Sequence, residues 1–164
     1  MWGLLPAEHE HATRPLPDPH IQDFANGLAG CKYFSKIDLL KVFHQIPIRK
    51  EDEPKTAILT PFGLYHFKLM PFGLSNAPQT FQRFMDLVFQ GLDFVFVYLD
   101  EFLVGSRTKE DHRKHLVLVF DCLEELGLVI KLQKCQFAAS DMVFLGHRIT
   151  PNGIFPVKDK AEAI

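Results

Sequence analysis

The feature that most constrains this chain is an acidic pair set between two strongly strand-forming segments. Residues 94–98 read FVFVY, Leu99 precedes Asp100 and Glu101, and residues 102–104 read FLV. β-branched and aromatic side chains favour strands, so the segment predicts a hairpin whose tip carries both carboxylates. Successive strand residues point to opposite faces, so the two acids converge only where the chain turns sharply.

A third acid, Asp38, ends a shorter predicted strand over residues 32–38. If this strand lies beside the hairpin, the three carboxylates meet at one edge of a sheet. Such a cluster of hard oxygen ligands is what Mg²⁺ prefers, with Mn²⁺ as an alternative. The competing interpretation is an ordinary solvated turn, because acidic residues are common in turns and on surfaces. Residue spacing alone does not separate the two.

The rest of the chain predicts an α+β architecture. Residues 1–20 contain four prolines and no periodicity, which indicates an irregular lead-in before a domain over residues 21–164. Helical periodicity predicts helices over residues 21–28, 76–90 and from Thr108 to Gly127, with Ser75 or Asn76 capping the second. Strands are expected at residues 55–60, 64–69, 128–132, 135–137 and 142–149. We therefore expect an antiparallel sheet with the two main helices packed on one face.

Composition excludes several classes of protein. Hydrophobic residues make up 47% and charged residues 23%, which is not the composition of a disordered chain. The net charge of −2 means that the chain has no overall positive charge to attract nucleic acid. Three cysteines without a CxxC pair argue against a disulfide framework and a zinc site, and favour a reduced intracellular compartment. We find no signal peptide or membrane span, so no membrane partner is expected and the cytoplasm is the default.

Four motifs in order resemble the reverse transcriptases. Tyr98-Leu99-Asp100-Glu101 resembles their Tyr-x-Asp-Asp hairpin. Three further stretches are similar to the Gypsy-type polymerases of LTR retrotransposons: residues 34–39 with 43–46 to the first catalytic motif, residues 69–78 to the template- and nucleotide-contacting motif, and residues 144–147 to the primer grip. The resemblance covers about residues 14–164 and implies a polymerase palm, with the later part of the fingers at about residues 44–78.

The resemblance also implies roles for individual residues. The catalytic residues would be Asp38, Asp100 and Glu101. The same three acids, together with the Leu39 carbonyl, would bind the metal. Phe43 would be the aromatic gate against a ribose 2′-hydroxyl, Phe72 and Gly73 would lie near the nucleotide, and Lys134 would be a candidate general acid for pyrophosphate departure. The primer grip would be Phe144, Leu145, Gly146 and His147. Two alternatives stay open: Phe43 as a core aromatic and Lys134 as an ordinary solvated lysine.

The chain departs from the family pattern in several places. Glu101 replaces a second Asp and displaces its carboxylate by one methylene, and Val42 stands where Gly or Ala is usual. Residues 1–13 do not match the basic early fingers, and no thumb or ribonuclease H region is expected in this chain. The function predicted is therefore RNA-directed DNA synthesis by two-metal phosphoryl transfer, impaired and truncated, on an RNA or DNA template-primer with dNTP. Exposed apolar palm surface predicts self-association.

Two other functions remain in view. One is a catalytically inactive, retroelement-derived domain that acts as a binding or interaction module. The other is an unrelated α+β metal-binding or nucleotide-binding domain, which explains the three acids and leaves the other motifs unexplained.

Overall fold

The computed structural model of the 164-residue chain describes residues 21–71, 73 and 77–157. The predicted lead-in, Phe72 and the two candidate cap residues, Ser75 and Asn76, lie outside the described residues. The chain divides into two compact units. The smaller unit comprises the described residues of Lys41–Phe84, and the larger comprises the described residues of Pro17–Leu40 and Met85–Ile164.

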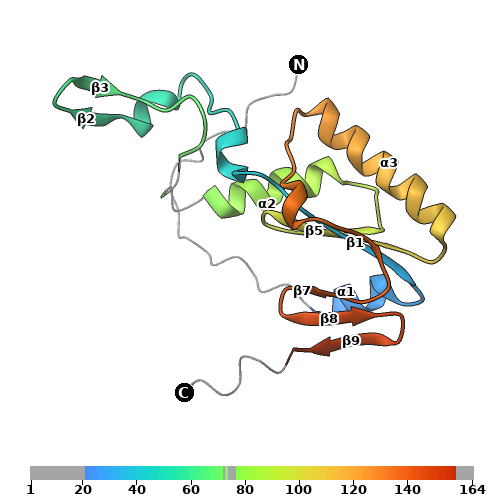
Figure 1. The fold of residues 1–164 in the computed structure, drawn as a ribbon. Helices are drawn as coiled ribbons and strands as arrows, with labels where there is room; N and C mark the ends of the chain where they lie inside the picture. The colour runs from blue at the N-terminus through green and yellow to red at the C-terminus, as the bar shows by residue number, and fades with distance from the viewer. Residues whose placement is uncertain (1–20, 72, 74–76, 158–164) are drawn as a thin grey trace, which may run out of the picture. The chain divides into compact units, whose positions relative to one another are not determined.

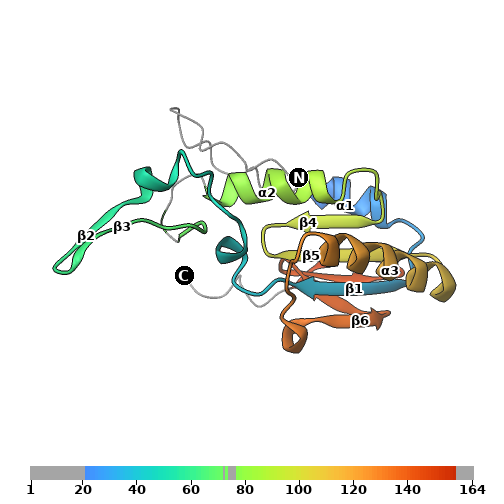
Figure 2. The same cartoon turned by 90° about the horizontal axis from the view of Figure 1, so that it is seen from above.

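The larger unit is built on two antiparallel sheets. A four-stranded sheet has the order β4-β5-β1-β6, and Figure 2 shows these strands side by side. The strands are β4 (Val95–Tyr98), β5 (Glu101–Ser106), β1 (Tyr33–Asp38) and β6 (Gln136–Ala139). A three-stranded sheet is formed by β7 (Met142–Phe144), β8 (His147–Thr150) and β9 (Gly153–Pro156), seen in Figure 1. The helices of this unit are α1 (Ile21–Leu28) and α3 (Lys109–Glu125).

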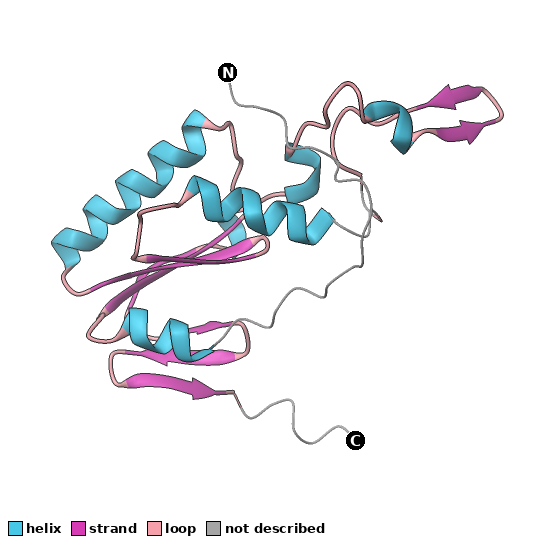
Figure 3. Ribbon diagram, turned by 180° about the vertical axis from the view of Figure 1, so that it is seen from behind, coloured by secondary structure: helices cyan, strands magenta, loops and turns pink. Residues whose placement is uncertain are grey.

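Different elements cover the two faces of the four-stranded sheet. On one face α3 contacts β5 and β1 and buries His112, Val119 and Leu123. The predicted start of α3 is confirmed, because the Thr108 hydroxyl accepts the Asp111 N–H as an N-cap. The opposite face packs against α1 and the three-stranded sheet (Figure 3), through a cluster of Leu28, Cys31, Phe34, Leu103, Met142, Phe144 and Ile149. The short helix α1 thus lies on the face opposite α3.

Close packing between α1 and the sheet depends on Gly105. A Cβ atom at this position would lie 2.6 Å from Cδ2 of Leu28 and 3.3 Å from Sγ of Cys31. Only a residue without a side chain lets the helix approach β5 this closely.

Two predicted strands of the larger unit differ from the structure. Residues 128–132 form no strand, because β1 ends at Asp38 and pairing beyond it is a single bridge between Leu39 and Ile130. A short 3₁₀ helix, η3 (Leu132–Lys134), follows. Residues 142–149 form two strands, because Leu145 and Gly146 both adopt positive φ, 50° and 75°, and make a tight hairpin turn.

The smaller unit carries a short hairpin. The predicted strands 55–60 and 64–69 shrink to β2 (Ile58–Thr60) and β3 (Gly63–Tyr65), because a 3₁₀ helix, η2 (Glu53–Thr56), takes up the start of the first, with Pro54 in its opening turn. The described residues also form η1 (Val42–Gln45), and α2 (Ala77–Val88) matches its predicted range. No helix in the described part of the chain is both long and apolar enough to cross a bilayer.

Candidate active site

The strand register brings the predicted acids to one end of the four-stranded sheet. Asp38 on β1 lies directly opposite Glu101 on β5, which lies opposite Tyr98 on β4. Directly paired residues share a face, so the two carboxylates project on the same side. The β4–β5 connection is Leu99 and Asp100, and the Leu39 N–H donates to the Asp100 carbonyl at 2.9 Å. The Asp100 turn therefore sits against the end of β1.

The turn that carries Asp100 is strained. Leu99 has a φ of 52°, in the left-handed region that a leucine rarely adopts. Such strain costs on the order of 1–3 kcal/mol and concentrates at functional sites. A turn held by two paired strands presents the Asp100 side chain at a fixed place.

Burial and charge differ among the three acids. The Asp38 side chain is only 4% exposed, Asp100 is exposed and Glu101 is half-buried. Like charges directly opposite one another in a sheet are destabilising, so the Asp38–Glu101 pair calls for a cation. The ammonium of Lys134 supplies one, with Nζ 3.6 Å from Oδ2 of Asp38.

The segment from Lys131 to Cys135 fixes Asp38 from the opposite side. The Lys131 N–H donates to the Asp38 carbonyl at 2.7 Å, and the Asp38 N–H donates to Sγ of Cys135 at 3.5 Å. These two bonds hold the residues that flank Lys134, which is why its ammonium reaches the Asp38 carboxylate. Sequence reasoning missed these contacts, because it placed residues 133–134 in a turn between two predicted strands and no local pattern links that turn to Asp38.

The donor set fits a divalent metal in its chemistry. Asp38, Asp100 and Glu101 offer carboxylate oxygens, the hard ligands that Mg²⁺ and Mn²⁺ prefer. The backbone of Leu39 lies against the Asp100 turn through its N–H, and the role of its carbonyl as a ligand stays a prediction. Among residues 21–71, 73 and 77–157, however, no three His, Cys, Asp or Glu side chains stand close enough to form a ready metal cluster.

The predicted primer-grip residues form the β7–β8 hairpin. Phe144 pairs with His147 across the turn of Leu145 and Gly146, and Nδ1 of His147 lies 3.0 Å from the Leu145 carbonyl oxygen. Phe144 is 3% exposed and its ring packs 5.9 Å from that of Phe24. Phe144 is thus a core residue that anchors the hairpin, while the turn itself is accessible.

The predicted nucleotide-binding residues fall in different units. Phe43 and Gly73 belong to the smaller unit and Lys134 to the larger, so their convergence on one nucleotide stays a prediction. Phe43 is half-buried with its ring edge-on to Phe81 at 6.1 Å, as a core aromatic would be. Gly73 is exposed with a φ of 91°, a conformation that favours glycine.

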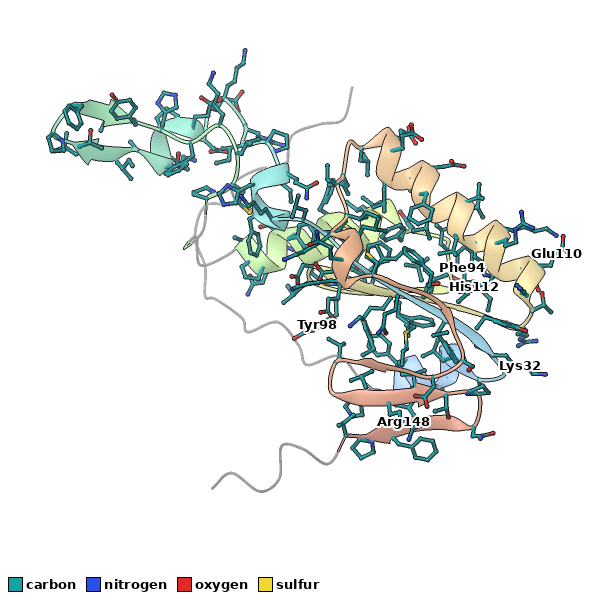
Figure 4. The ribbon with its side chains drawn as sticks, viewed as in Figure 1. Lys32, Phe94, Tyr98, Glu110, His112 and Arg148 are labelled. Atoms are coloured by element: carbon teal, nitrogen blue, oxygen red, sulfur yellow. The ribbon has the colours of Figure 1, made fainter. Side chains whose placement is uncertain are left out.

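A buried polar network on the other face of the sheet was not predicted. Nε2 of His112 lies 2.7 Å from the Ser35 hydroxyl, and its Nδ1 lies 2.8 Å from that of Ser106. The Ser106 hydroxyl also lies 2.8 Å from Nδ1 of His115, whose ring stacks on Phe94 at 3.6 Å. Figure 4 shows His112 and Phe94 at the end of the sheet away from Tyr98. The sequence signal was two serines inside strands, where small polar residues pack poorly unless they are bonded.

Burial sets the protonation of this network. Removal from water lowers the pKa of His112, and the nearby His115 lowers it further. Both ring nitrogens of His112 face hydroxyl groups, which can donate or accept. The network is therefore satisfied with a neutral imidazole.

Comparison with known proteins identifies the family. The model of the family "Reverse transcriptase (RNA-dependent DNA polymerase)" matches residues 5–149. The chain is 41% identical over 150 residues to the retrovirus-related Pol polyprotein from transposon 297 of Drosophila melanogaster, and 32% identical over 150 residues to the Tf2-3 polyprotein of Schizosaccharomyces pombe. These alignments cover 90% of the chain, and 14% and 11% of the two polyproteins.

Solved structures confirm the predicted fold class. The foamy viral protease-reverse transcriptase in complex with RNA/DNA hybrid matches 96% of this chain and 20% of its own, with 26% identity and a TM-score of 0.74. A second structure of that protein, in complex with double-stranded DNA, matches with a TM-score of 0.75 and 26% identity. The mixed helix and antiparallel sheet described above is a polymerase palm-like α+β fold, and the chain belongs to the reverse transcriptase (RNA-dependent DNA polymerase) family.

Proposed function

We propose that this chain is the palm, with the later fingers at about residues 44–78, of a Gypsy-type retrotransposon polymerase. Its reaction is RNA-directed DNA synthesis from dNTP on an RNA or DNA template-primer. The observation that carries the proposal is the meeting of Asp38, Glu101 and the Asp100 turn at one end of the sheet. The likeness to the transposon 297 and 412 polyproteins, at 41% and 37% identity, supports the Gypsy-type assignment.

Each residue of the site has a role in the proposed reaction. Asp38 and Asp100, with the Leu39 carbonyl and Glu101, would hold two Mg²⁺ or Mn²⁺ ions. When bound, two such ions stabilise the charge on the attacking and leaving oxygens of phosphoryl transfer. Lys134 protonates the departing pyrophosphate, and its exposed side chain leaves the ammonium free to move toward that group.

Other residues orient the substrates. Phe43 excludes a ribose 2′-hydroxyl, and Phe72 and the backbone of Gly73 approach the nucleotide. The accessible turn between Phe144 and His147 holds the primer terminus. The foamy viral protein is solved with an RNA/DNA hybrid and with double-stranded DNA, which supports a template-primer duplex as the partner.

Glu101 and Val42 impair the proposed activity. Mg²⁺ demands near-ideal octahedral geometry, and the longer glutamate places its oxygens about one methylene away from those of an aspartate. Because Glu101 lies directly opposite Asp38, the displaced Glu101 carboxylate changes the geometry of the proposed metal site itself. Val42, which stands where Gly or Ala is usual in the family, is the second departure on which the proposed impairment rests.

Primer extension tests the proposal. The chain is incubated with an RNA template, a DNA primer and dNTP, first with Mg²⁺ and then with Mn²⁺, beside an Asp100→Asn variant and an Asp121→Asn control. Asp121 is an exposed acid on α3, far along the sequence from the site. Extension that Asp100→Asn abolishes and Asp121→Asn preserves supports the proposal. Extension that survives Asp100→Asn contradicts it.

The second candidate is a catalytically inactive domain that binds nucleic acid or a protein. The substitution at Glu101 favours it, as does the lack of a ready three-ligand metal cluster among the described residues. Fluorescence anisotropy with a labelled RNA/DNA duplex separates the two functions. Duplex binding without extension in either metal favours the binding module.

Self-association is proposed through exposed apolar surface. The most exposed large apolar side chains lie on the β2–β3 hairpin of the smaller unit, at Leu59 (84%) and Phe62 (89%). The support for association therefore comes from the proposed fingers more than from the palm. Light scattering of the chain and of a Leu59→Ser, Phe62→Ser double variant tests this, and a monodisperse monomer of the natural chain contradicts it.

A further inference from the structure

The ion pair between Lys134 and Asp38 is unusual in its asymmetry. The Asp38 side chain is 4% exposed, whereas that of Lys134 is 56% exposed. A buried carboxylate is costly unless a cation or hydrogen-bond donors accompany it. A flexible, mostly exposed lysine side chain is a cation that can leave again at little cost.

The geometry of the pair is loose. Nζ lies 3.6 Å from Oδ2 of Asp38, beyond the 2.7–2.9 Å or so of a charge-assisted hydrogen bond. In contrast, the backbone beside Lys134 is held firmly, by the 2.7 Å bond from the Lys131 N–H to the Asp38 carbonyl. The fold therefore fixes the backbone of Lys134, while its ammonium makes only a weak ion pair with the Asp38 carboxylate.

We propose that Lys134 is the resident counter-ion of Asp38 in the metal-free chain and that it exchanges with a divalent metal at that carboxylate. This inference rests on the proposed function, because it takes Asp38 to be a metal ligand. Lys134 then lowers metal affinity, since its ammonium occupies the same oxygen and repels a second cation nearby. Exchange also releases the ammonium into solvent when the metal arrives.

Metal affinity tests the proposal without any catalytic readout. Mn²⁺ is titrated into the full 164-residue chain without nucleic acid, and free Mn²⁺ is followed by electron paramagnetic resonance. Lys134→Met removes the charge and keeps the length, and Lys134→Arg keeps the charge. Lys114→Met is the matched control, because Lys114 is an exposed lysine 3.9 Å from Glu110 on α3.

We expect Lys134→Met to bind Mn²⁺ about two- to fivefold more tightly, the upper part of the range for one partly exposed ion pair. Lys134→Arg and Lys114→Met are expected to bind as the natural chain does. An unchanged affinity in Lys134→Met overturns the proposal.

A second measurement uses the natural chain. Lysine acylation is mapped by mass spectrometry with and without saturating Mg²⁺, and Lys134 is compared with Lys114. Release of the ammonium predicts that acylation of Lys134 rises in Mg²⁺ while that of Lys114 does not. Equal reactivity of Lys134 in both conditions contradicts the exchange.

An Asp38→Asn variant separates this inference from the proposed function. If Asp38→Asn binds Mn²⁺ as tightly as the natural chain, Asp38 is not a metal ligand and both proposals fail. If Asp38→Asn loses Mn²⁺ while Lys134→Met binds as the natural chain does, the metal site stands and only the counter-ion role of Lys134 falls.

Discussion

Strand β1 carries two buried polar residues three positions apart, Ser35 and Asp38. The hydrogen bonding of Ser35 and the charge of Asp38 are compensated in different ways. At Ser35 the hydroxyl meets Nε2 of His112 and accepts the Ala138 N–H at 2.9 Å, so neutral groups of the chain complete each other. At Asp38 a buried carboxylate faces Glu101, and its cation is a loosely held lysine. A complete neutral network stabilises the fold, whereas an under-compensated charged cluster is suited to bind a ligand.

The difference between these clusters follows from position along the strand. Ser35 lies inside the sheet beneath α3, where water cannot reach and every polar atom needs a partner from the chain. Asp38 is the last residue of β1, beside a turn that exposes Asp100. A buried group at the end of a strand remains close enough to solvent to receive an ion.

The largest effect is expected from Asp38→Asn, which breaks the charged cluster. Primer extension should fall by on the order of 10³-fold, the scale for removing a group that stabilises the transition state. Stability should change by less than about 1 kcal/mol, because losing the Lys134 pair is offset by relief of repulsion from Glu101. Extension rates and urea unfolding of the same samples check this. A variant that unfolds while its remaining folded fraction extends normally would place Asp38 with the structural cluster instead.

The converse change, His112→Ala, breaks the neutral cluster. It removes one hydrogen-bond partner from each of the buried Ser35 and Ser106 hydroxyls and leaves a cavity where the buried imidazole stood, so it should cost about 3 kcal/mol of unfolding free energy. His115→Ala is the control, because His115 is half-buried and contacts Ser106 but not Ser35. Urea denaturation of both variants measures the effect. Equal losses in the two variants would mean that the network is not centred on His112.

The pH dependence of stability sharpens the same comparison. Burial lowers the pKa of His112 below its ordinary value of 6.5. The unfolded chain then binds this proton more tightly than the folded one, so stability is full above about pH 6.5 and is lost as pH falls from there toward the lowered pKa. Urea unfolding between pH 7.5 and 5 should show this loss, and His112→Gln should reduce it. A dependence that His112→Gln leaves intact would assign it to another group.

The smallest effect is expected at the bulge that serves the neutral cluster. Between Phe34 and Lys36 the pairing partner on β6 moves from Ala139 to Gln136, so β6 carries an extra residue and Ala138 adopts a φ of 51°. Ala138→Gly relieves this left-handed strain and should raise stability by about 0.5–1 kcal/mol. Thermal unfolding checks the increase. A loss of stability would show that the bulge is not strained.

Patterns local in sequence were predictable. The ends of α1 and the N-cap at Thr108 follow from periodicity and capping chemistry. The β4–β5 hairpin was predicted with Asp100 and Glu101 at its tip, but the turn is Leu99 and Asp100, because Glu101 is the first residue of β5 and pairs with Tyr98. The meeting of Asp38 with the hairpin was expected only on the condition that the two strands are neighbours, and the pairing of β1 with β5 supplies that condition.

Features that depend on pairs distant in sequence were not predictable. His112 and Ser35 lie 77 residues apart, and Cys135 and Asp38 lie 97 apart, so no local pattern links them. The sequence placed residues 133–134 in a turn between predicted strands at residues 128–132 and 135–137, and gave no sign that this turn reaches Asp38. Residues 128–132 have strand-like composition, but their pairing with the chain beyond β1 is a single bridge, between Leu39 and Ile130.

The most direct test of the central claim is the rate of primer extension by Glu101→Asp on an RNA template in Mg²⁺, relative to the natural chain. We expect an increase of about tenfold, because the shorter side chain returns the carboxylate opposite Asp38 to the position that metal geometry requires. If Glu101→Asp, Asp100→Asn and the natural chain all extend the primer at the same rate, the acids at this end of the sheet do not carry the reaction.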